Sequence, residues 1–138
     1  MRCMVIVKAT PASEAGEMGP PEVFEEMGRF NEELMKAGVL LAGEGLHPSS
    51  TGARITFDGD AKIVVDGPFA ETKELVAGFW ILQVKSFDEA VEWMKRSPFR
   101  EGTIEIRRVF ETEDFGDAIP DEVRESEERM RAGIADRQ

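Results

Sequence analysis

Two amphipathic segments, each lying between short apolar runs, constrain the fold of this chain more than any other feature. In the first, residues 22–37, apolar side chains recur at helical spacing. The side chains on its predicted inner face are Val23, Met27, Phe30 and Leu34. The second begins after Ser86, which has the spacing of a capping box with Glu89, and it ends at residues 97–98. Its predicted inner face consists of Phe87, Ala90, Val91 and Met94.

Apolar and β-branched segments predict the strands that these helices would cover. They are residues 2–8, 39–46, 53–57, 62–65, 78–84 and 103–109. Residues 58–60, Asp-Gly-Asp, predict a tight hairpin turn, and residues 10–21 predict a loop. The order is strand–helix–strand, a hairpin insertion, and strand–helix–strand. We therefore expect an α+β fold of the ferredoxin-like sandwich type, an antiparallel sheet with two helices on one face.

The other face of the predicted sheet would remain apolar, because the strands are hydrophobic almost throughout. Leaving such a face in water costs roughly 25 cal/mol for each Å². A second copy of the chain packed against it would remove that cost. The sequence therefore predicts a homodimer.

Residues 111–138 differ from the rest in composition, with ten acidic residues and four arginines, a balance of −6. A helix is predicted over residues 121–132, although its apolar positions are sparse. The segment is either a frayed tail or an arm that docks on the partner subunit, and Phe110 and Phe115 as anchors favour the arm. We expect a core domain of residues 1–110 and an acidic, partly helical C-terminal arm of residues 111–138.

The overall charge excludes several classes of partner. The net charge is −11, with 28 acidic and 17 basic residues, which argues against binding to nucleic acid or to an anionic membrane. No apolar run approaches the ~20 residues of a membrane-spanning helix, and no signal peptide is apparent. The one cysteine, Cys3, excludes an internal disulfide and is expected to be a buried small hydrophobe. These features predict a cytoplasmic protein.

The sequence predicts neither a metal nor a cofactor. Zinc sites need clustered cysteine and histidine, and the chain has one of each, far apart. The alternating acidic spacing of a calcium loop is missing. Residues 43–45, Gly-Glu-Gly, lack the downstream glycine and the helix of a phosphate-binding loop. The expected ligand is a small molecule.

Residues 66–74, with the sequence DGPFAETKE, carry more chemistry than a link between two strands requires. Such a link needs Gly or Pro and a few polar groups, not four ionisable side chains around a phenylalanine. Asp66 has two interpretations: a turn former that accepts backbone N–H bonds, or a general base at a cleft. The predicted substrate contacts in this segment are Phe69, Glu71, Lys73 and Glu74. Alternatively, the Phe69 ring packs into the core, and Glu71, Lys73 and Glu74 form an ion pair on the surface.

Two further candidates precede this segment. His47 is the only histidine, and it is either a surface side chain or a proton shuttle paired with Asp66 or Glu44. Glu44 lies between two glycines, which permit close approach of a ligand, or it is an acid at a strand edge facing solvent. Asp66 and His47 are therefore the predicted catalytic residues, and Glu44 joins the predicted substrate contacts.

The DGPFAETKE string resembles the motif of the DGPF group of YCII-related proteins, and the resemblance covers residues 2–109. Residues 43–46, residues 78–79 and residues 104–107 match in order. The resemblance implies ferredoxin-like subunits that pair sheet to sheet as a dimeric α/β barrel, with a cleft on each subunit. It also implies His–Asp acid–base chemistry in the broader group, and a branch that resembles a dehydrochlorinase acting on a hydroxylated aromatic. Some relatives are linked to extracytoplasmic-function sigma factors.

The chain departs from this family pattern at the first helix. Smaller relatives carry a histidine there, whereas residues 22–37 contain none, and Met27 lies near the corresponding level. Two functions stay open. The favoured one is a small, cofactor-independent enzyme that uses acid–base chemistry on a small polar or aromatic molecule, in a cleft between the sheet and the first helix, roofed by residues 66–74. The alternative is a non-catalytic ligand-binding or regulatory partner linked to transcription.

Overall fold

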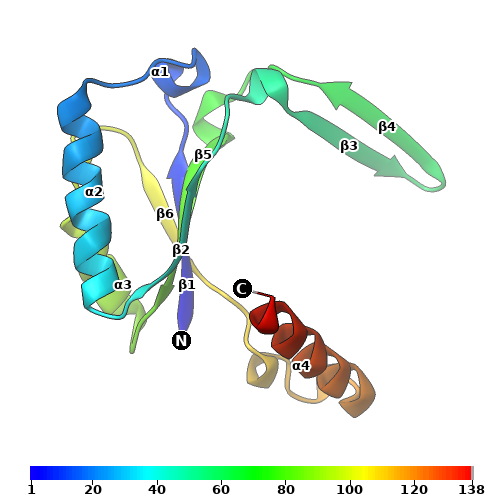
Figure 1. Ribbon diagram of the computed structural model, residues 1–138. Helices are drawn as coiled ribbons and strands as arrows, with labels where there is room; N and C mark the ends of the chain where they lie inside the picture. Colours follow the sequence, from blue (N-terminus) through cyan, green and yellow to red (C-terminus); the bar gives the residue numbers. More distant parts are fainter. Residues whose placement is uncertain (138) are drawn as a thin grey trace. The chain divides into compact units, whose positions relative to one another are not determined.

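Figure 1 shows the computed structural model of the chain, in which residues 1–137 are described. The strands are β1 (Arg2–Lys8), β2 (Leu40–Gly45), β3 (Ala53–Asp58), β4 (Ala61–Asp66), β5 (Val76–Gln83) and β6 (Ile104–Arg108). The helices are α1 (Pro11–Glu14), α2 (Pro21–Lys36), α3 (Phe87–Lys95) and α4 (Asp121–Asp136). Short 3₁₀ turns cover Ser49–Thr51, Thr72–Glu74 and Thr112–Ala118. The chain divides into two compact units, Met1–Arg108 and a second that begins at Val109.

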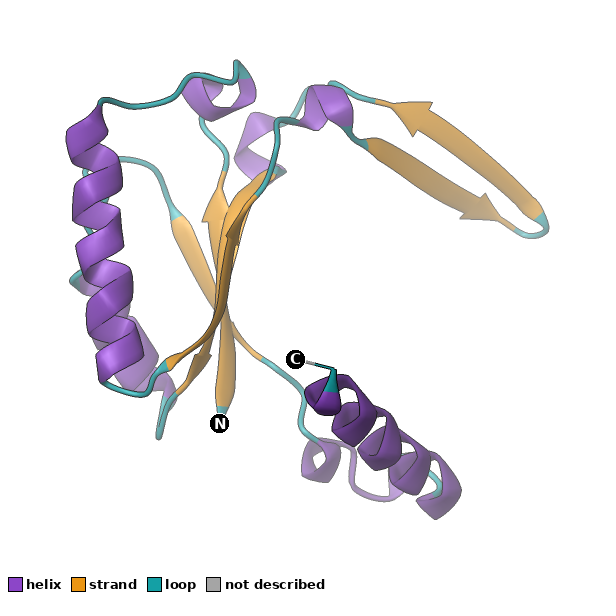
Figure 2. Cartoon of the chain, viewed as in Figure 1, coloured by secondary structure: helices purple, strands orange, loops and turns teal. Residues whose placement is uncertain are grey.

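The first unit is built on an antiparallel sheet with the strand order β2-β5-β1-β6. This order, with α2 between β1 and β2 and α3 between β5 and β6, is that of a ferredoxin-like fold. Both helices cover the same face of the sheet (Figure 2). The predicted α+β class, the antiparallel sheet and its two covering helices are confirmed. The pairing of two copies stays a prediction.

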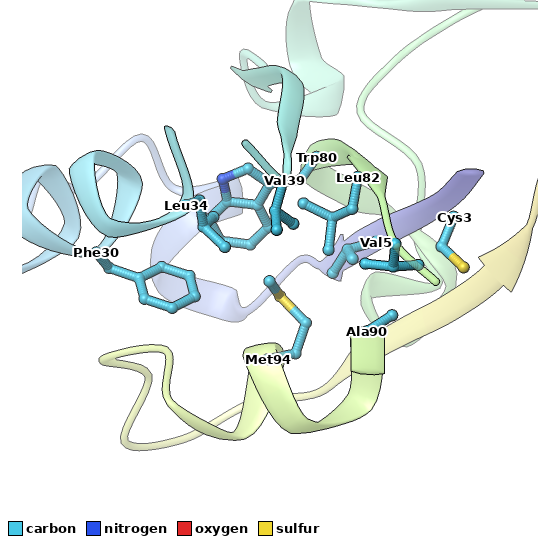
Figure 3. Packing of buried hydrophobic residues seen from close by; sticks show 10 residues of the cluster. Cys3, Val5, Phe30, Leu34, Val39, Trp80, Leu82, Ala90 and Met94 are labelled. Carbon is cyan, nitrogen blue, oxygen red and sulfur yellow. The ribbon is translucent and has the colours of Figure 1, made fainter. Parts of the chain in front are cut away.

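The core lies between this sheet and the two helices (Figure 3). Alternation along β1 turns Cys3 and Val5 toward the helices, and the register places Leu82 and Trp80 of β5 opposite them. The helices contribute Phe30, Leu34, Ala90 and Met94. Cys3 is fully buried, as expected of a small hydrophobe.

The opposite face of the sheet carries a second set of apolar side chains. Met4 pairs with Ile81 and Ile6 pairs with Phe79 across β1 and β5, and all four are half-buried. They alternate with the core residues, so they point away from the helices. The apolar outer face expected from the sequence is therefore present in the first unit.

The segment predicted as a loop, residues 10–21, contains the short helix α1. Thr10 caps this helix: its hydroxyl accepts a hydrogen bond from Ser13 N at 3.1 Å, and Ser13 Oγ accepts one from Thr10 N at 2.9 Å. Pro11 occupies the first helical position, where its fixed φ is favourable. The loop prediction is wrong for these residues because this local capping outweighs their Gly- and Pro-rich surroundings.

Two side chains predicted to face the core do not. Val23, in the first turn of α2, is 49% exposed, and Phe87, at the start of α3, is 39% exposed. Val23 instead borders a cleft described below. The capping at α3 also differs in one partner. Ser86 Oγ accepts from Glu89 N at 3.1 Å as predicted, but the Glu89 carboxylate accepts from Lys85 N, at 2.8 Å.

The insertion forms a separate two-stranded sheet, β3–β4, whose residues are all exposed. The predicted turn is confirmed, and Gly59 has a φ of 60°, which a glycine adopts without strain. Both faces of the hairpin carry apolar side chains. Ile55, Phe57 and Val64 lie on one face, and Ile63 and Val65 lie on the other.

The second unit has its own local packing. The rings of Phe110 and Phe115 stack with centroids 4.8 Å apart, and Arg124 Nη2 donates to the Gly116 carbonyl at 2.7 Å. The helix predicted over residues 121–132 is confirmed and extends to Asp136. Its apolar residues remain exposed: Val123, Met130 and Ile134. Docking of this arm on a partner subunit stays a prediction.

Candidate functional site

A cleft of about 950 Å³ opens between the first turns of α2, the sheet and the segment that follows α3. Its apolar wall comes from Val7, Val23, Met27, Phe99 and Ile104. The expected cleft between the sheet and the first long helix is therefore present. Its lining includes residues 97–104 and no residue of 66–74, so the expected roof is wrong.

A smaller pocket of about 240 Å³ continues this cleft toward β2. The two spaces share four lining residues, Val7, Met27, Ala77 and Phe99. The smaller pocket adds Asn31 of α2, residues 43–45 of β2, and Phe79 and Trp80 of β5. The larger cleft is therefore continuous with a smaller pocket beside Trp80.

Trp80 lines the smaller pocket and makes most of its aromatic contacts with neighbouring side chains. Its ring meets Phe30 and Phe99 edge to face, each with centroids 6.0 Å away, and it is only 6% exposed. Gly43 lies against it, since a Cβ on Gly43 would be 2.8 Å from Trp80 Cδ1. The indole Nε1–H donates to Asn31 Oδ1 at 2.9 Å. This bond orients the Asn31 amide, because an indole nitrogen only donates and must face the amide oxygen.

Charged side chains surround the mouth of the cleft. Arg100 donates to both carboxylate oxygens of Glu26, at 3.2 and 3.4 Å, and both residues line the cleft. The Glu26 side chain is 32% exposed and the Arg100 side chain 81%. Glu26 is therefore a carboxylate at the cleft wall that is held by one arginine and still reached by solvent. It can accept a proton from a bound O–H or N–H group.

The 66–74 segment is bound to the turn after β2. Gly67 N donates to the Gly52 carbonyl at 2.9 Å, and Phe69 N donates to Ser49 Oγ at 3.1 Å. The Gly67-Pro68 peptide bond is cis. The backbones approach so closely that a Cβ on Gly67 would lie 1.7 Å from the Ser49 carbonyl oxygen. The DGPF residues therefore hold their own turn against the turn at residues 49–52.

Glu14 of α1 binds the same turn through Ser49. Its carboxylate accepts hydrogen bonds from Ser49 N at 3.0 Å and from the Ser49 hydroxyl. The hydroxyl bond and the backbone bond hold the pKa of Glu14 below its ordinary value. Sequence reasoning missed both residues. Nothing in the sequence links Ser49 to a partner 35 residues earlier.

The charged residues of the segment form a second local cluster. The Arg54 guanidinium lies over the Phe69 ring, 3.9 Å from its centroid. A hydrogen bond to the Glu74 carboxyl raises the pKa of Glu71, the charge of Glu74 adds to this, and Arg54 opposes it. The structure thus brings Phe69 to Ser49 and Arg54, and Glu71 to Glu74.

The other predicted site residues take no part in these contacts. Asp66 ends β4, His47 follows β2, and both are exposed. Within residues 1–137, no hydrogen bond or ion pair joins either of them to another predicted site residue. Lys73 is exposed in the 3₁₀ turn, and Glu44 is exposed at the edge of the smaller pocket. Glu44 is the one predicted site residue, in the described part of the chain, that borders either space.

Residues 1–137 contain no group of three or more His, Cys, Asp or Glu side chains placed to hold a metal ion. No helix within the same residues has the length and apolar character needed to cross a membrane.

Comparisons with known proteins place the chain in a family. An uncharacterised protein of Rhizobium meliloti (strain 1021), R00369, is 33% identical over 73 residues, which are 53% of this chain and 59% of that protein. The chain thus aligns with about three fifths of that relative. A solved structure of 5-chloro-2-hydroxyhydroquinone dehydrochlorinase from Burkholderia phenoliruptrix AC1100, in complex with 2,5-dihydroxybenzoquinone, has 14% sequence identity and a TM-score of 0.47. The superposition covers 83% of this chain and 98% of that one. Residues 1–113 match the YCII-related domain, and the chain belongs to this family.

Proposed function

We propose that this YCII-related protein is a small, cofactor-independent enzyme whose ligand occupies the cleft between α2 and the sheet. The observation that carries the proposal is the cleft itself, about 950 Å³ in volume, with an apolar wall and a carboxylate at its rim. Pockets of this size and character are typical of small-molecule sites. The reaction class is acid–base chemistry on a small polar or aromatic molecule. Assignment to the DGPF group, and a cytoplasmic location, belong to the same proposal.

Three residues are candidates for the proton transfer. Glu26 is added to the predicted Asp66 and His47 because it lines the cleft, where a bound O–H or N–H group would come within reach. Asp66 and His47 do not line it, and their catalytic roles stay predictions. The substrate contacts predicted at Glu44, Phe69, Glu71, Lys73 and Glu74 stay predictions in the same way.

Parallel substitutions test the proton transfer. A library of phenols and small polar metabolites would be screened for turnover with the wild type, Glu26→Gln, Asp66→Asn and His47→Gln. The base is the residue whose substitution abolishes turnover while the melting temperature stays within a few degrees of the wild type. Glu32→Gln is the matched control, because Glu32 is an exposed acid on the same helix outside the cleft lining. Turnover that survives all three substitutions would refute the acid–base assignment.

A homodimer is the second part of the proposal. The outer sheet face carries Met4, Ile6, Phe79 and Ile81, and pairing with a second copy would cover them. We expect the wild type to sediment as a dimer, and Phe79→Glu to sediment as a monomer with retained helix content. A monomeric wild type at micromolar concentration would contradict this part and leave the cleft proposal intact.

The alternative function is a non-catalytic ligand-binding or regulatory partner linked to transcription. The β3–β4 hairpin favours it, because exposed apolar side chains on both faces suit burial by another protein. Ligand binding without any turnover, together with stoichiometric recovery of a transcription protein on a tagged chain, would support this alternative over the enzyme.

A further inference from the structure

Strand β4 of the insertion has a free edge that is both exposed and apolar. Every residue of β3 and β4 is exposed, and the two strands pair only with each other. A sheet of two strands is marginally stable in water, and additional strands stabilise it. The middle of β4 consists of three consecutive β-branched residues, Ile63, Val64 and Val65, with no proline or glycine among them. Such an edge is a template for pairing with another strand.

The register of the hairpin determines which residues of β4 face that free edge. Gly67 N donates to the Gly52 carbonyl at 2.9 Å, and these two residues continue the register of β3 and β4. In an antiparallel pair, the backbone groups of successive residues point alternately toward the partner strand and away from it. Because those of Gly67 point toward β3, those of Lys62, Val64 and Asp66 point away from it. A second strand would therefore bond to these three residues.

The three residues carry charges in an order that is complementary to itself. Antiparallel pairing of two β4 strands about Val64 places Lys62 of each copy opposite Asp66 of the other. On the other face of the strands, it places Ile63 opposite Val65. Opposite charges and β-branched side chains directly across from each other both stabilise a strand pair. Within residues 1–137, neither Lys62 nor Asp66 forms an ion pair, so both charges are available to a second copy.

Neighbouring registers and the other edge of the hairpin lack this complementarity. A shift of two residues in one direction places Asp60 opposite Asp66, and like charges across strands are destabilising. A shift in the other direction places Lys62 opposite Pro68, which has no N–H to donate. The residues that face the free edge of β3 carry no charge: Ala53, Ile55 and Phe57.

We infer that β4 is a self-association edge, through which two copies of the chain form a four-stranded sheet of the order β3-β4-β4-β3. The contact is isologous, since each copy contributes the same strand, and Val64 lies at its two-fold axis. This inference goes beyond the proposed function and does not rest on it. It concerns an edge that lines neither the cleft nor the smaller pocket, and it differs from the outer sheet face of the proposed homodimer.

A disulfide crosslink tests the contact independently of any other association. Val64→Cys would place two thiols on a hydrogen-bonded pair, whose Cα atoms lie about 5.5 Å apart, within the range of about 4.4–6.8 Å that a disulfide spans. Ile55→Cys is the matched control, because Ile55 is the neighbour of Val64 on the same face and is similarly exposed, 55% against 63%. Its two copies would be three strand spacings apart, about 14 Å. The native Cys3 is buried.

The purified variants would be treated with oxidised glutathione at low micromolar concentration, and the covalent dimer would be measured by non-reducing electrophoresis. We expect rapid formation of the dimer by Val64→Cys and little by Ile55→Cys. Circular dichroism checks that the helix content is retained, as it should be for substitutions outside the core.

Charge reversal then tests the register. In the Val64→Cys background, Lys62→Asp alone and Asp66→Lys alone would each place like charges at both ends of the strand pair. We expect each to slow crosslinking about tenfold at low ionic strength. A mixture of the two variants restores opposite charges at both ends, so it should regain fast crosslinking, with the mixed dimer as the main product by mass spectrometry. Damage to the hairpin itself would not be repaired by mixing.

The contrary outcomes are equally defined. Equal crosslinking of Val64→Cys and Ile55→Cys would mean random collision and would overturn the pairing. A Val64→Cys chain that forms no covalent dimer would overturn it too, and would leave the hairpin to a different protein. A mixture that crosslinks no faster than the separate charge variants would overturn the register. None of these results bears on turnover in the cleft, which is assayed separately.

Discussion

Gly67 and Ser49 meet backbone to backbone, so closely that a Cβ on Gly67 would lie 1.7 Å from the Ser49 carbonyl oxygen. The glycine of the DGPF segment is thus required by a contact with a turn that precedes it in the chain. The same turn binds Phe69 N through the Ser49 hydroxyl and Glu14 through both of its carboxylate oxygens. Much of what makes this segment unusual in the sequence therefore serves its architecture.

Gly67→Ala should lower the free energy of unfolding by about 1–3 kcal/mol, the usual cost of forcing an extra carbon into a filled site. The atoms it meets belong to the backbone, which cannot turn aside as a side chain can. Urea denaturation followed by circular dichroism measures the change. Gly28→Ala is the control, because a Cβ there meets nothing within 4 Å and the helix gains propensity. An unfolding free energy of Gly67→Ala equal to that of the wild type would contradict the contact.

Glu14→Gln should destabilise the protein near neutral pH and lose this effect in acid. The folded pKa of Glu14 lies below the unfolded one, because Ser49 bonds the charged form. Its stabilisation is therefore present above the unfolded pKa and is lost as the pH falls through the folded pKa. Melting temperatures of the wild type and the variant across a pH series test this. Glu17→Gln serves as the control, and a difference that persists unchanged into acid would speak against the hydrogen bonds to Ser49.

Glu71→Gln should have the opposite effect on stability near neutral pH: it should stabilise the protein. The folded pKa of Glu71 is raised, mainly by the hydrogen bond to the Glu74 carboxyl, so its contribution is present below the unfolded pKa and is lost as the pH rises through the folded pKa. At neutral pH the glutamine removes the repulsion between two carboxylates and still offers a donor to Glu74. We expect a melting temperature above that of the wild type near neutrality. Carboxyl NMR titration provides the independent reading, and a Glu71 pKa at or below the ordinary value would refute the pairing.

Gly43→Ala should displace the Trp80 indole, since the new Cβ would lie 2.8 Å from Trp80 Cδ1. The indole is held by Asn31 and by two phenylalanine rings, so we expect a loss of about 1–3 kcal/mol in unfolding free energy. The Trp80 N–H resonance should move at the same time. Gly45→Ala is matched on the same strand, where a Cβ meets nothing within 4 Å. An unmoved Trp80 signal in Gly43→Ala would mean that the strand yields instead.

The fold could be predicted because each of its main helices and strands has a local sequence pattern of its own. Helical spacing in residues 22–37 and alternation in the strands follow from the need to bury one face. The prediction failed at Val23, because a cleft lies between the first turn of α2 and the sheet. It failed at α1, because the Gly- and Pro-rich composition of residues 10–21 predicted a loop and the capping by Thr10 and Ser13 was not recognised.

The candidate site was only partly visible for a different reason. The DGPF segment stood out by composition, yet its partners Ser49 and Glu14 become neighbours only through the tertiary fold. Asn31 carried no signal at all, since a single amide on a helix is ordinary until an indole 49 residues later fixes its orientation. Long-range hydrogen bonds of this kind produce no periodic pattern in the sequence, so the sequence does not predict them.

The closure at the base of the β3–β4 hairpin makes this insertion exchangeable. Gly67 N bonds the Gly52 carbonyl at 2.9 Å, and Ala53 pairs with Asp66, so the chain leaves and returns at one place. The sheet and the core helices are complete without the residues between those points. A segment grafted there needs only ends that meet at the spacing of one antiparallel pair. The hairpin position is thus a suitable insertion site for affinity tags, reporter loops or transplanted binding hairpins.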